Sequence, residues 1–223
     1  MKTKTIFCTT LILASSQVLA CSMANFSANY NLMNKNLKTI GSTHRSLTLK
    51  NGGTYSFQSK SEINTRFLKD TVTLISHGHF NKNGFQPKES LMIEKAKGKR
   101  KLTTIQPNTY DIPSYVLQMR FDLQRGIKNL SYTVNNGKTT QTYRFKPLAQ
   151  QVVNTPMGNI TVLPMQSNAV AGISTEVLYD PQHHFRLVGT KQYKNGHLKL
   201  MSLITSYQAP TTKHCLIQLS THG

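Results

Sequence analysis

Apolar and polar residues alternate with a period of two along most of the chain. Near its start, Phe26, Ala28 and Tyr30 are separated by the polar residues Ser27 and Asn29. A strand that is buried on one face and wet on the other has this pattern, because successive side chains point to opposite faces. Thr, Tyr, Phe and Val are frequent in these runs and suit a pleated surface. The same alternation recurs at 55–58, 130–134, 143–145 and 198–200.

Short turn motifs separate the alternating segments. Asparagine followed by glycine suits the left-handed backbone of a tight hairpin, so it predicts antiparallel strands joined in sequence order. This dipeptide stands between two alternating runs at Asn51-Gly52, Asn83-Gly84, Asn136-Gly137 and Asn195-Gly196.

The pattern predicts an all-β, mainly antiparallel fold, either a curved sheet or an incomplete up-and-down β-barrel, of about ten strands with one α-helix near 112–125. We expect strands near 25–33, 43–50, 54–60, 63–80 (continuous, or broken near Lys69-Asp70), 88–96, 128–135, 139–146, 149–154, 159–166, 172–179, 184–192 and 197–207.

The expected helix is the one segment that breaks the alternation. Its apolar residues, such as Tyr115, Met119 and Leu123, recur at intervals of three and four rather than two. Pro113 is placed for the first helical turn, and Gly126 is placed to end the helix. Such a helix would lie against a sheet face or plug one end of a barrel.

The first 24 residues are typical of a signal peptide. A short basic start precedes the uncharged apolar run from Ile6 to Ala20, which is too short to cross a bilayer comfortably as a helix. Cleavage after Ala20 would make Cys21 the first mature residue, open to acylation. Cleavage after Ala24 would release a soluble chain. The bulky Leu19 suits an acylation motif poorly and favours the soluble product.

Removal of residues 1–24 leaves 25–223, which is the length of one β-rich domain with a real core. The predicted location is the periplasm or the exterior, or alternatively the membrane surface as a lipoprotein anchored through Cys21. If cleavage follows Ala20 without acylation, Cys21 and Cys215 could form a disulfide.

The chain is strongly basic. Loss of Lys2 and Lys4 with the signal leaves 25 basic against 8 acidic residues, a net charge of +17. Such a charge attracts anionic partners, and the attraction weakens as salt is raised. The alternative is that a high isoelectric point is a general property of the organism's secreted proteins and indicates no particular partner. The expected partners are anionic lipid, lipopolysaccharide or cell-wall polymer. No nucleic-acid motif is present, so no specific nucleic acid is expected as a partner. We expect contact with a membrane only through a lipid anchor. The sequence does not indicate an oligomeric state.

Basic residues gather in two stretches. One is a predicted glycine-containing loop and a candidate ligand-binding patch, formed by Lys95, Lys97, Lys99, Arg100 and Lys101. The other would form a phosphate-binding patch if its members share the wet face of the sheet, and comprises His44, Arg45, Lys50, Lys60, Arg66 and Lys69. The alternative is that these side chains are scattered and solvated.

His77 and His79 flank a glycine on a predicted strand, so their imidazoles share one face about 6–7 Å apart. With a third ligand, from His183-His184 or His214-Cys215, they could hold Zn²⁺ or Cu²⁺. Exposed strand histidines without a metal are the simpler interpretation.

The sequence contains no recognisable catalytic arrangement. Only eight acidic residues exist; Asp111 sits where a helix cap would be, and Glu89 and Glu94 would face opposite sides of a strand. Cys215 beside His214 is a sequence neighbour rather than a catalytic geometry. Nucleophile-elbow, phosphate-loop and dinucleotide motifs are absent, and no cofactor is expected.

Short motifs follow one another in a fixed order over about residues 25–207. They are Phe26-Ser-Ala-Asn-Tyr30, Gly41, Gly53-Thr-Tyr55, Phe80-Asn-Lys-Asn-Gly84-Phe-Gln-Pro87, Asp111-Ile-Pro-Ser114-Tyr115 with Arg120 and Gly126, Thr155-Pro156-Met-Gly158, Tyr179-Asp180 and Lys194-Asn195-Gly196. This series resembles an uncharacterised family of exported bacterial proteins, the domain of unknown function 3108. The resemblance implies an envelope location and a curved antiparallel sheet or incomplete barrel, with no established reaction and no catalytic residues to transfer.

Three functional hypotheses follow. The first is a non-enzymatic envelope protein that binds a lipid or another anionic, amphipathic ligand in its curved sheet. The second is a structural or scaffolding module that docks on cell-wall polymer or a partner protein. The third is a metal-binding protein or hydrolase that uses His77 and His79.

Overall fold

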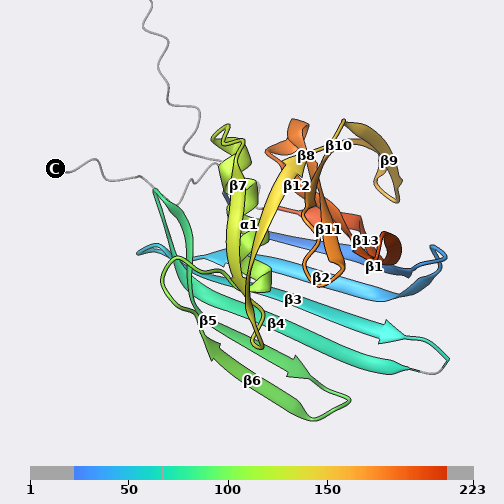
Figure 1. The fold of residues 1–223 in the computed structure, drawn as a ribbon, viewed down its shortest axis with the longest axis horizontal. Coiled ribbons are helices and arrows are strands. Elements are labelled where there is room, and N and C mark those ends of the chain that lie inside the picture. Colours follow the sequence, from blue (N-terminus) through green and yellow to red (C-terminus); the bar gives the residue numbers. More distant parts are fainter. Residues whose placement is uncertain (1–22, 67, 210–223) are drawn as a thin grey trace, which may run out of the picture.

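Thirteen strands and one α-helix form the described part of the chain, residues 23–66 and 68–209 of a computed structural model (Figure 1). The first half contains β1 (Phe26–Asn34), β2 (Thr39–Leu49), β3 (Thr54–Asn64), β4 (Lys69–Asn81), β5 (Gly84–Glu94), β6 (Lys99–Thr104) and α1 (Ile112–Gln124). The second half contains β7 (Leu130–Asn135), β8 (Thr140–Pro147), β9 (Gln151–Thr155), β10 (Gly158–Ser167), β11 (Ile173–Asp180), the 3₁₀ turn η2 (Pro181–His183), β12 (Arg186–Lys194) and β13 (His197–Gln208).

The strands form one strongly curved antiparallel sheet. Its order is β6-β5-β4-β3-β2-β1-β13-β12-β11-β10-β8-β7, and β9 pairs with β10 beside this path. The first and last strands pair at the centre, so β6 and β7 are left as the two ends of the sheet. These ends do not pair with each other. The prediction of a curved, mainly antiparallel sheet with one helix is therefore confirmed.

All four Asn-Gly dipeptides lie in hairpin turns, as predicted. Asn195 and Gly196, for example, both have positive φ, 52° and 77°, in the turn between β12 and β13. The number of strands is thirteen rather than about ten. The expected extended range 63–80 combines the end of β3 with most of β4. Between the two strands, the Thr65 backbone N–H donates a hydrogen bond of 2.8 Å to the Leu68 carbonyl oxygen.

The prediction of a loop from Lys95 to Lys101 is wrong. A tight turn closes by a hydrogen bond of 3.1 Å from the Gly98 backbone N–H to the Lys95 carbonyl oxygen, and β6 begins at Lys99. The sequence of β6 has only one large apolar residue, Leu102. An edge strand gains its hydrogen bonds from a single neighbour and is commonly protected by lysine, so it needs no apolar alternation.

The predicted helix is confirmed at both ends. Asp111 is the N-cap, and its carboxylate accepts a hydrogen bond of 2.8 Å from the Ser114 backbone N–H. The Ser114 hydroxyl accepts in return from the Asp111 backbone N–H at 3.1 Å, which completes a capping box. Pro113 lies in the first turn, and Gly126, with φ 73°, follows the last turn.

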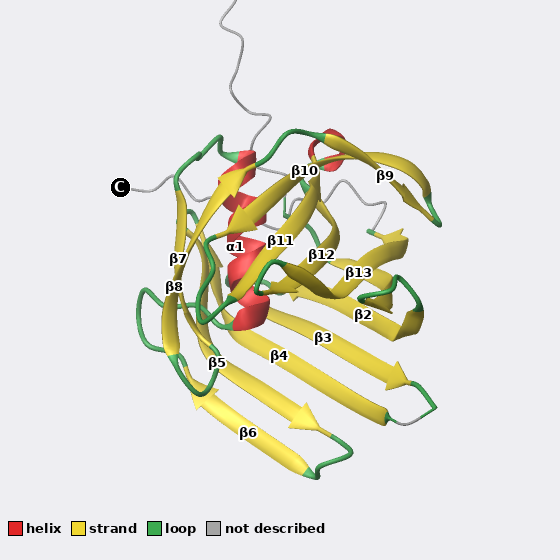
Figure 2. Cartoon of the chain, turned by 45° about the vertical axis from the view of Figure 1, so that its right-hand side comes forward, coloured by secondary structure: helices red, strands yellow, loops and turns green. Residues whose placement is uncertain are grey.

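The helix lies inside the curve of the sheet, with strands on more than one side of it (Figure 2). This position explains why polar helix residues are buried along with apolar ones. Met119 is fully buried. Gln118, Arg120 and Asp122 are almost fully buried.

A buried hydrogen-bond chain through α1 joins β5, beside one end of the sheet, to β7 at the other end. Gln118 Oε1 accepts from the Phe85 backbone N–H of β5 at 2.7 Å, and Gln118 Nε2 donates to Asp122 Oδ1 at 2.9 Å. The Tyr132 hydroxyl of β7 donates to Asp122 Oδ2 at 2.8 Å. We call Gln118, Asp122 and Tyr132 the seam network.

Among the described residues, no helix is both long enough and apolar enough to span a bilayer. Cys21, Cys215 and residues 1–22 of the predicted signal peptide lie outside the described residues. Cleavage, acylation and the disulfide therefore stay predictions.

Candidate functional site

Strands β3–β6 extend well past α1, so part of their concave face is not covered by the helix (Figure 1). On β4, the side chains of Ser76 and Phe80 point into the core. The period of two then places Val72 and Leu74 on the same concave face. Both are partly exposed.

A row of side chains crosses this open region. Leu74 of β4 is in register with Met92 of β5, and Met92 is in register with Lys101 of β6. The neighbouring row runs from Val72 through Glu94 of β5 to Lys99, so the Glu94 carboxylate also lies on this face. We call Val72, Leu74, Met92, Lys99 and Lys101 the concave strip. It has an apolar floor with two ammonium groups along its edge.

The five basic residues predicted as one patch do not share a face. Lys99 and Lys101 belong to the concave strip, whereas the alternation of β6 turns Arg100 to the convex face. Lys95 and Lys97 lie in the hairpin turn, and Lys97 Nζ forms an ion pair of 2.8 Å with Glu94 Oε2. The pKa of Lys97 is raised by this hydrogen bond and charge.

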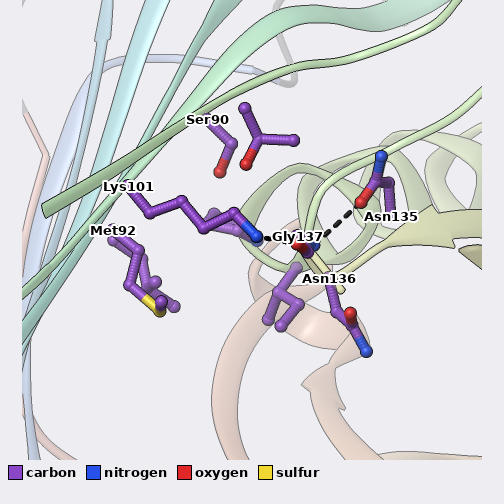
Figure 3. Close-up of a pocket in the computed structure, with 10 residues that line it drawn as sticks. Ser90, Met92, Lys101, Asn135, Asn136 and Gly137 are labelled. Carbon is purple, nitrogen blue, oxygen red and sulfur yellow. Dashed lines mark hydrogen bonds between the residues drawn. The ribbon is translucent and has the colours of Figure 1, made fainter. Parts of the chain in front are cut away.

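The inner end of the strip meets the seam between the two ends of the sheet (Figure 3). There Lys101 Nζ donates a hydrogen bond to the carbonyl oxygen of Gly137 in the β7–β8 turn. Ser90, Met92 and Asn136 line a hollow of about 40 Å³ beside this contact. Such a volume admits a few water molecules and no acyl chain. A lipid chain would therefore have to lie on the open strip, not in this hollow.

Asp111 is the most buried carboxyl group near the seam. Only one of its oxygens has a partner, the Ser114 backbone N–H, and Oδ2 is buried without one. Burial raises the pKa of Asp111, and hydrogen bonding from Ser114 offsets part of this effect. The structure confirms its role as a helix cap.

The raised pKa gives a stability prediction. A carboxyl group with a raised folded-state pKa binds more protons folded than unfolded, so its contribution is present at low pH and is lost as the pH rises through the folded pKa. Asp111→Asn keeps the cap acceptor and has no proton to lose. We expect it to remove a slope of up to about 1.4 kcal/mol per pH unit above pH ~4. Urea unfolding at a series of pH values measures this; an unchanged slope would contradict it.

His77 and His79 lie on the convex face of β4, beside an open hollow that Lys50, Lys88 and Glu89 also line. Glu89 is in register with His77, so the structure supplies a carboxylate that the sequence did not suggest. Within residues 23–66 and 68–209, however, no three His, Cys, Asp or Glu side chains are grouped closely enough to hold a metal ion.

The other suggested metal ligands lie elsewhere. His183 Nδ1 is 2.7 Å from Asp180 Oδ2, next to the 3₁₀ turn. His214 and Cys215 lie outside the described residues. The metal site stays a prediction.

Sequence reasoning missed two interior arginines. Arg45 was grouped with solvent-facing basic residues, but it shares the inner face of β2 with Thr43 and Leu47. Their spacing of two was the available signal. Arg120 of α1 is 6% exposed, although nothing in the helix sequence distinguishes it from a solvated arginine.

Comparison with known proteins gives only distant similarities. No family model matches the chain, so membership of the domain of unknown function 3108 is not confirmed. No curated protein matches either.

Two solved structures are similar in outline. One is a protein from Bacteroides fragilis whose export is inferred and which has a YmcC-like fold; it is 8% identical, with a TM-score of 0.38, over 83% of this chain and 96% of that one. The other is inferred to be a lipoprotein, from Parabacteroides distasonis; it is 7% identical, with a TM-score of 0.38, over 84% and 96%. Neither similarity bears on function.

Proposed function

We propose that the protein is an exported, non-enzymatic protein of the bacterial envelope that binds an anionic amphiphile on its concave strip. The acyl part of the ligand lies on Val72, Leu74 and Met92, and its anionic group lies against Lys99 and Lys101. The observation that carries the proposal is the register of β4, β5 and β6, which aligns the apolar floor with two lysines on one open face.

The charge of the surroundings supports this proposal. The net charge of the mature chain draws anionic surfaces toward the protein, and each lysine near an anionic bilayer contributes about 1 kcal/mol to binding. In the described part of the chain, no acidic side chain forms an ion pair with Lys99 or Lys101. Glu94, in register with Lys99, is paired with Lys97 instead. Lys101 Nζ uses one of its three N–H groups on the Gly137 carbonyl oxygen. Both ammonium groups therefore keep donors for a ligand.

Binding to vesicles tests the proposal. The wild-type protein should sediment with phosphatidylglycerol vesicles at low salt, bind phosphatidylcholine vesicles far less, and lose binding as salt is raised. Lys99→Gln combined with Lys101→Gln should weaken the association by up to about 30-fold, because two contributions of about 1 kcal/mol are lost.

The control removes the same number of charges from the convex face. Lys88→Gln combined with Arg100→Gln takes two exposed charges from that face, and it should weaken binding by a few-fold at most. Equal loss in the two double variants would show that only net charge matters and would overturn the concave strip as the site. Circular dichroism confirms that both variants fold.

A further inference from the structure

Arg45 and Arg120 point into the concave interior without an acidic partner. All eight side-chain carboxylates of the protein lie in the described residues, and none lies within 4.0 Å of either guanidinium group. Arg120 is 6% exposed, and Arg45 is partly buried and still reached by solvent. A buried charge without a counter-charge is unfavourable, so binding of an anion beside these two arginines would be stabilising.

The inner face of β1 supplies the surface for both groups. Phe26, Ala28 and Tyr30 alternate along this face, and Arg45 is in register with the small Ala28. The Arg45 guanidinium carbon lies 4.7 Å from the centroid of the Tyr30 ring. That of Arg120 lies 5.7 Å from the centroid of the Phe26 ring. Two rings on one strand, two residues either side of Ala28, thus hold the two guanidinium groups.

Both charges act on the same buried phenols. Burial raises the pKa of Tyr30 and of Tyr179, and the positive charges of Arg45 and Arg120 each offset part of that rise in both residues. Charge effects weaken with distance, so each of the two guanidinium groups lies near both phenols.

The orientation of Arg120 is fixed by the protein. Its Nε donates a hydrogen bond of 3.0 Å to the carbonyl oxygen of His184, a residue in the left-handed region with φ 52°. This contact occupies one of the five N–H groups of the guanidinium. Within the described residues, no other hydrogen bond of this guanidinium is present, and the group would lose little entropy on binding a ligand because it is already held.

A third arginine of this cluster, Arg186, is neutralised by an acidic residue of the protein. Arg186 lies over the Tyr207 ring, at 5.3 Å, and that ring stacks on Phe26. Its Nη2 lies 2.6 Å from Asp180 Oδ2 in a buried ion pair. The same aromatic cluster therefore contains one arginine that the chain neutralises and two that it does not.

We propose that Arg45 and Arg120 together bind a phosphate group between β1, β2 and α1. A planar guanidinium group presents two N–H donors to two oxygens of a phosphate, and a tetrahedral phosphate has enough oxygens to receive such a pair from each arginine. A carboxylate has only two oxygens and suits one arginine. The site is separate from the concave strip and does not depend on the function proposed there.

Thermal unfolding and calorimetry with inorganic phosphate test the site. The wild-type melting temperature should rise with phosphate more than with chloride at equal ionic strength. Arg45→Gln should abolish this difference and weaken phosphate binding at least about tenfold, the value of one charge-assisted hydrogen bond. In phosphate-free buffer, Arg45→Gln should melt no lower than wild type, because an unpaired charge has been removed.

Two further variants keep the test sharp. Arg45→Lys retains the charge and loses the paired donors, so it should also bind phosphate more weakly than wild type. Arg100→Gln removes an exposed charge from the convex face and should bind phosphate as the wild type does. The proposal is overturned if phosphate and chloride shift the wild-type melting temperature equally, or if Arg45→Gln and Arg100→Gln lose binding to the same extent.

The source of the phosphate group is distinguished by a short-chain phosphatidic acid used below its micelle concentration. Displacement of inorganic phosphate by this lipid at lower concentration identifies a lipid head group as the ligand. Displacement only by free phosphate esters without acyl chains identifies a soluble phosphate. The double variant Lys99→Gln and Lys101→Gln should leave phosphate binding intact, which separates a failure here from a failure of the concave strip.

Discussion

Replacing Gln118 by leucine should lower the free energy of unfolding by about 3–5 kcal/mol. The substitution removes the acceptor of the buried Phe85 backbone N–H and the donor to the Asp122 carboxylate in one step. Each group left without a partner costs about 1–3 kcal/mol, and more where it is charged. Urea unfolding followed by circular dichroism measures the loss.

An exposed glutamine provides the control. Gln106 lies in the segment between β6 and α1 and is exposed, so Gln106→Leu should change stability by at most about 0.5 kcal/mol. A loss of less than 1 kcal/mol for Gln118→Leu would show that the seam network does not hold the sheet ends together.

A double-mutant cycle separates the network from its parts. Tyr132→Phe removes the hydroxyl that donates to Asp122 Oδ2 at 2.8 Å. Both partners reach the same carboxylate, so the combined loss of Gln118→Leu and Tyr132→Phe should differ from the sum of the single losses by at least about 0.5 kcal/mol. Strict additivity would mean that the two ends of the sheet are held independently.

The local signals of this sequence were enough for the fold class, because each depends only on near neighbours. The four Asn-Gly turns and the Asp111, Pro113 and Gly126 signals of α1 require no knowledge of the rest of the chain. Strand β6 was missed for the opposite reason. Its extended conformation depends on pairing with β5, and its basic, polar sequence gives no local signal of that pairing.

The candidate site was beyond sequence reasoning because it depends on which way β5 faces. Leu91, Met92 and Ile93 are consecutive apolar residues, so no alternation indicates which of them is on the concave face. The interior arginines were missed on similar grounds: Arg45 follows the period of β2, but its neighbour His44 is equally polar and points outward.

One extra residue in β5 decides which of its side chains point to the concave face. Gly78 of β4 is in register with Pro87, and the preceding His77 is in register with Glu89, so Lys88 is left over as a bulge. Before the bulge, Phe85 and Pro87 are buried and face the core. Beyond it, a shift of one residue turns the even-numbered side chains inward, and Met92 therefore joins the concave strip.

Gly78 makes this bulge possible, so Gly78→Ala should be strongly destabilising. A Cβ atom at this position would clash with the Gln86 carbonyl oxygen and would lie 2.7 Å from Pro87 Cα. Both are backbone atoms that cannot rotate away, and we expect a loss of about 3 kcal/mol or more in the free energy of unfolding. Urea unfolding measures this loss.

The matched control is Gly98→Ala in the β5–β6 turn. Its φ of 59° is left-handed, and no atom lies within 4 Å of the added carbon. It should cost only about 1–2 kcal/mol, the strain of the left-handed backbone. If the two substitutions cost the same, the close approach of β4 and β5 at Gly78 is not what holds the bulge.

The same substitution connects stability to binding. Where Gly78→Ala remains folded at low temperature, relief of the clash requires β4 and β5 to separate or to slip by one residue. A slip would turn Met92 and Lys101 to the convex face and dismantle the concave strip. Binding to phosphatidylglycerol vesicles should then fall at least as far as in the double lysine variant, whereas Gly98→Ala should bind as wild type. Full binding by a folded Gly78→Ala protein would show that the facing of β5 does not depend on this glycine.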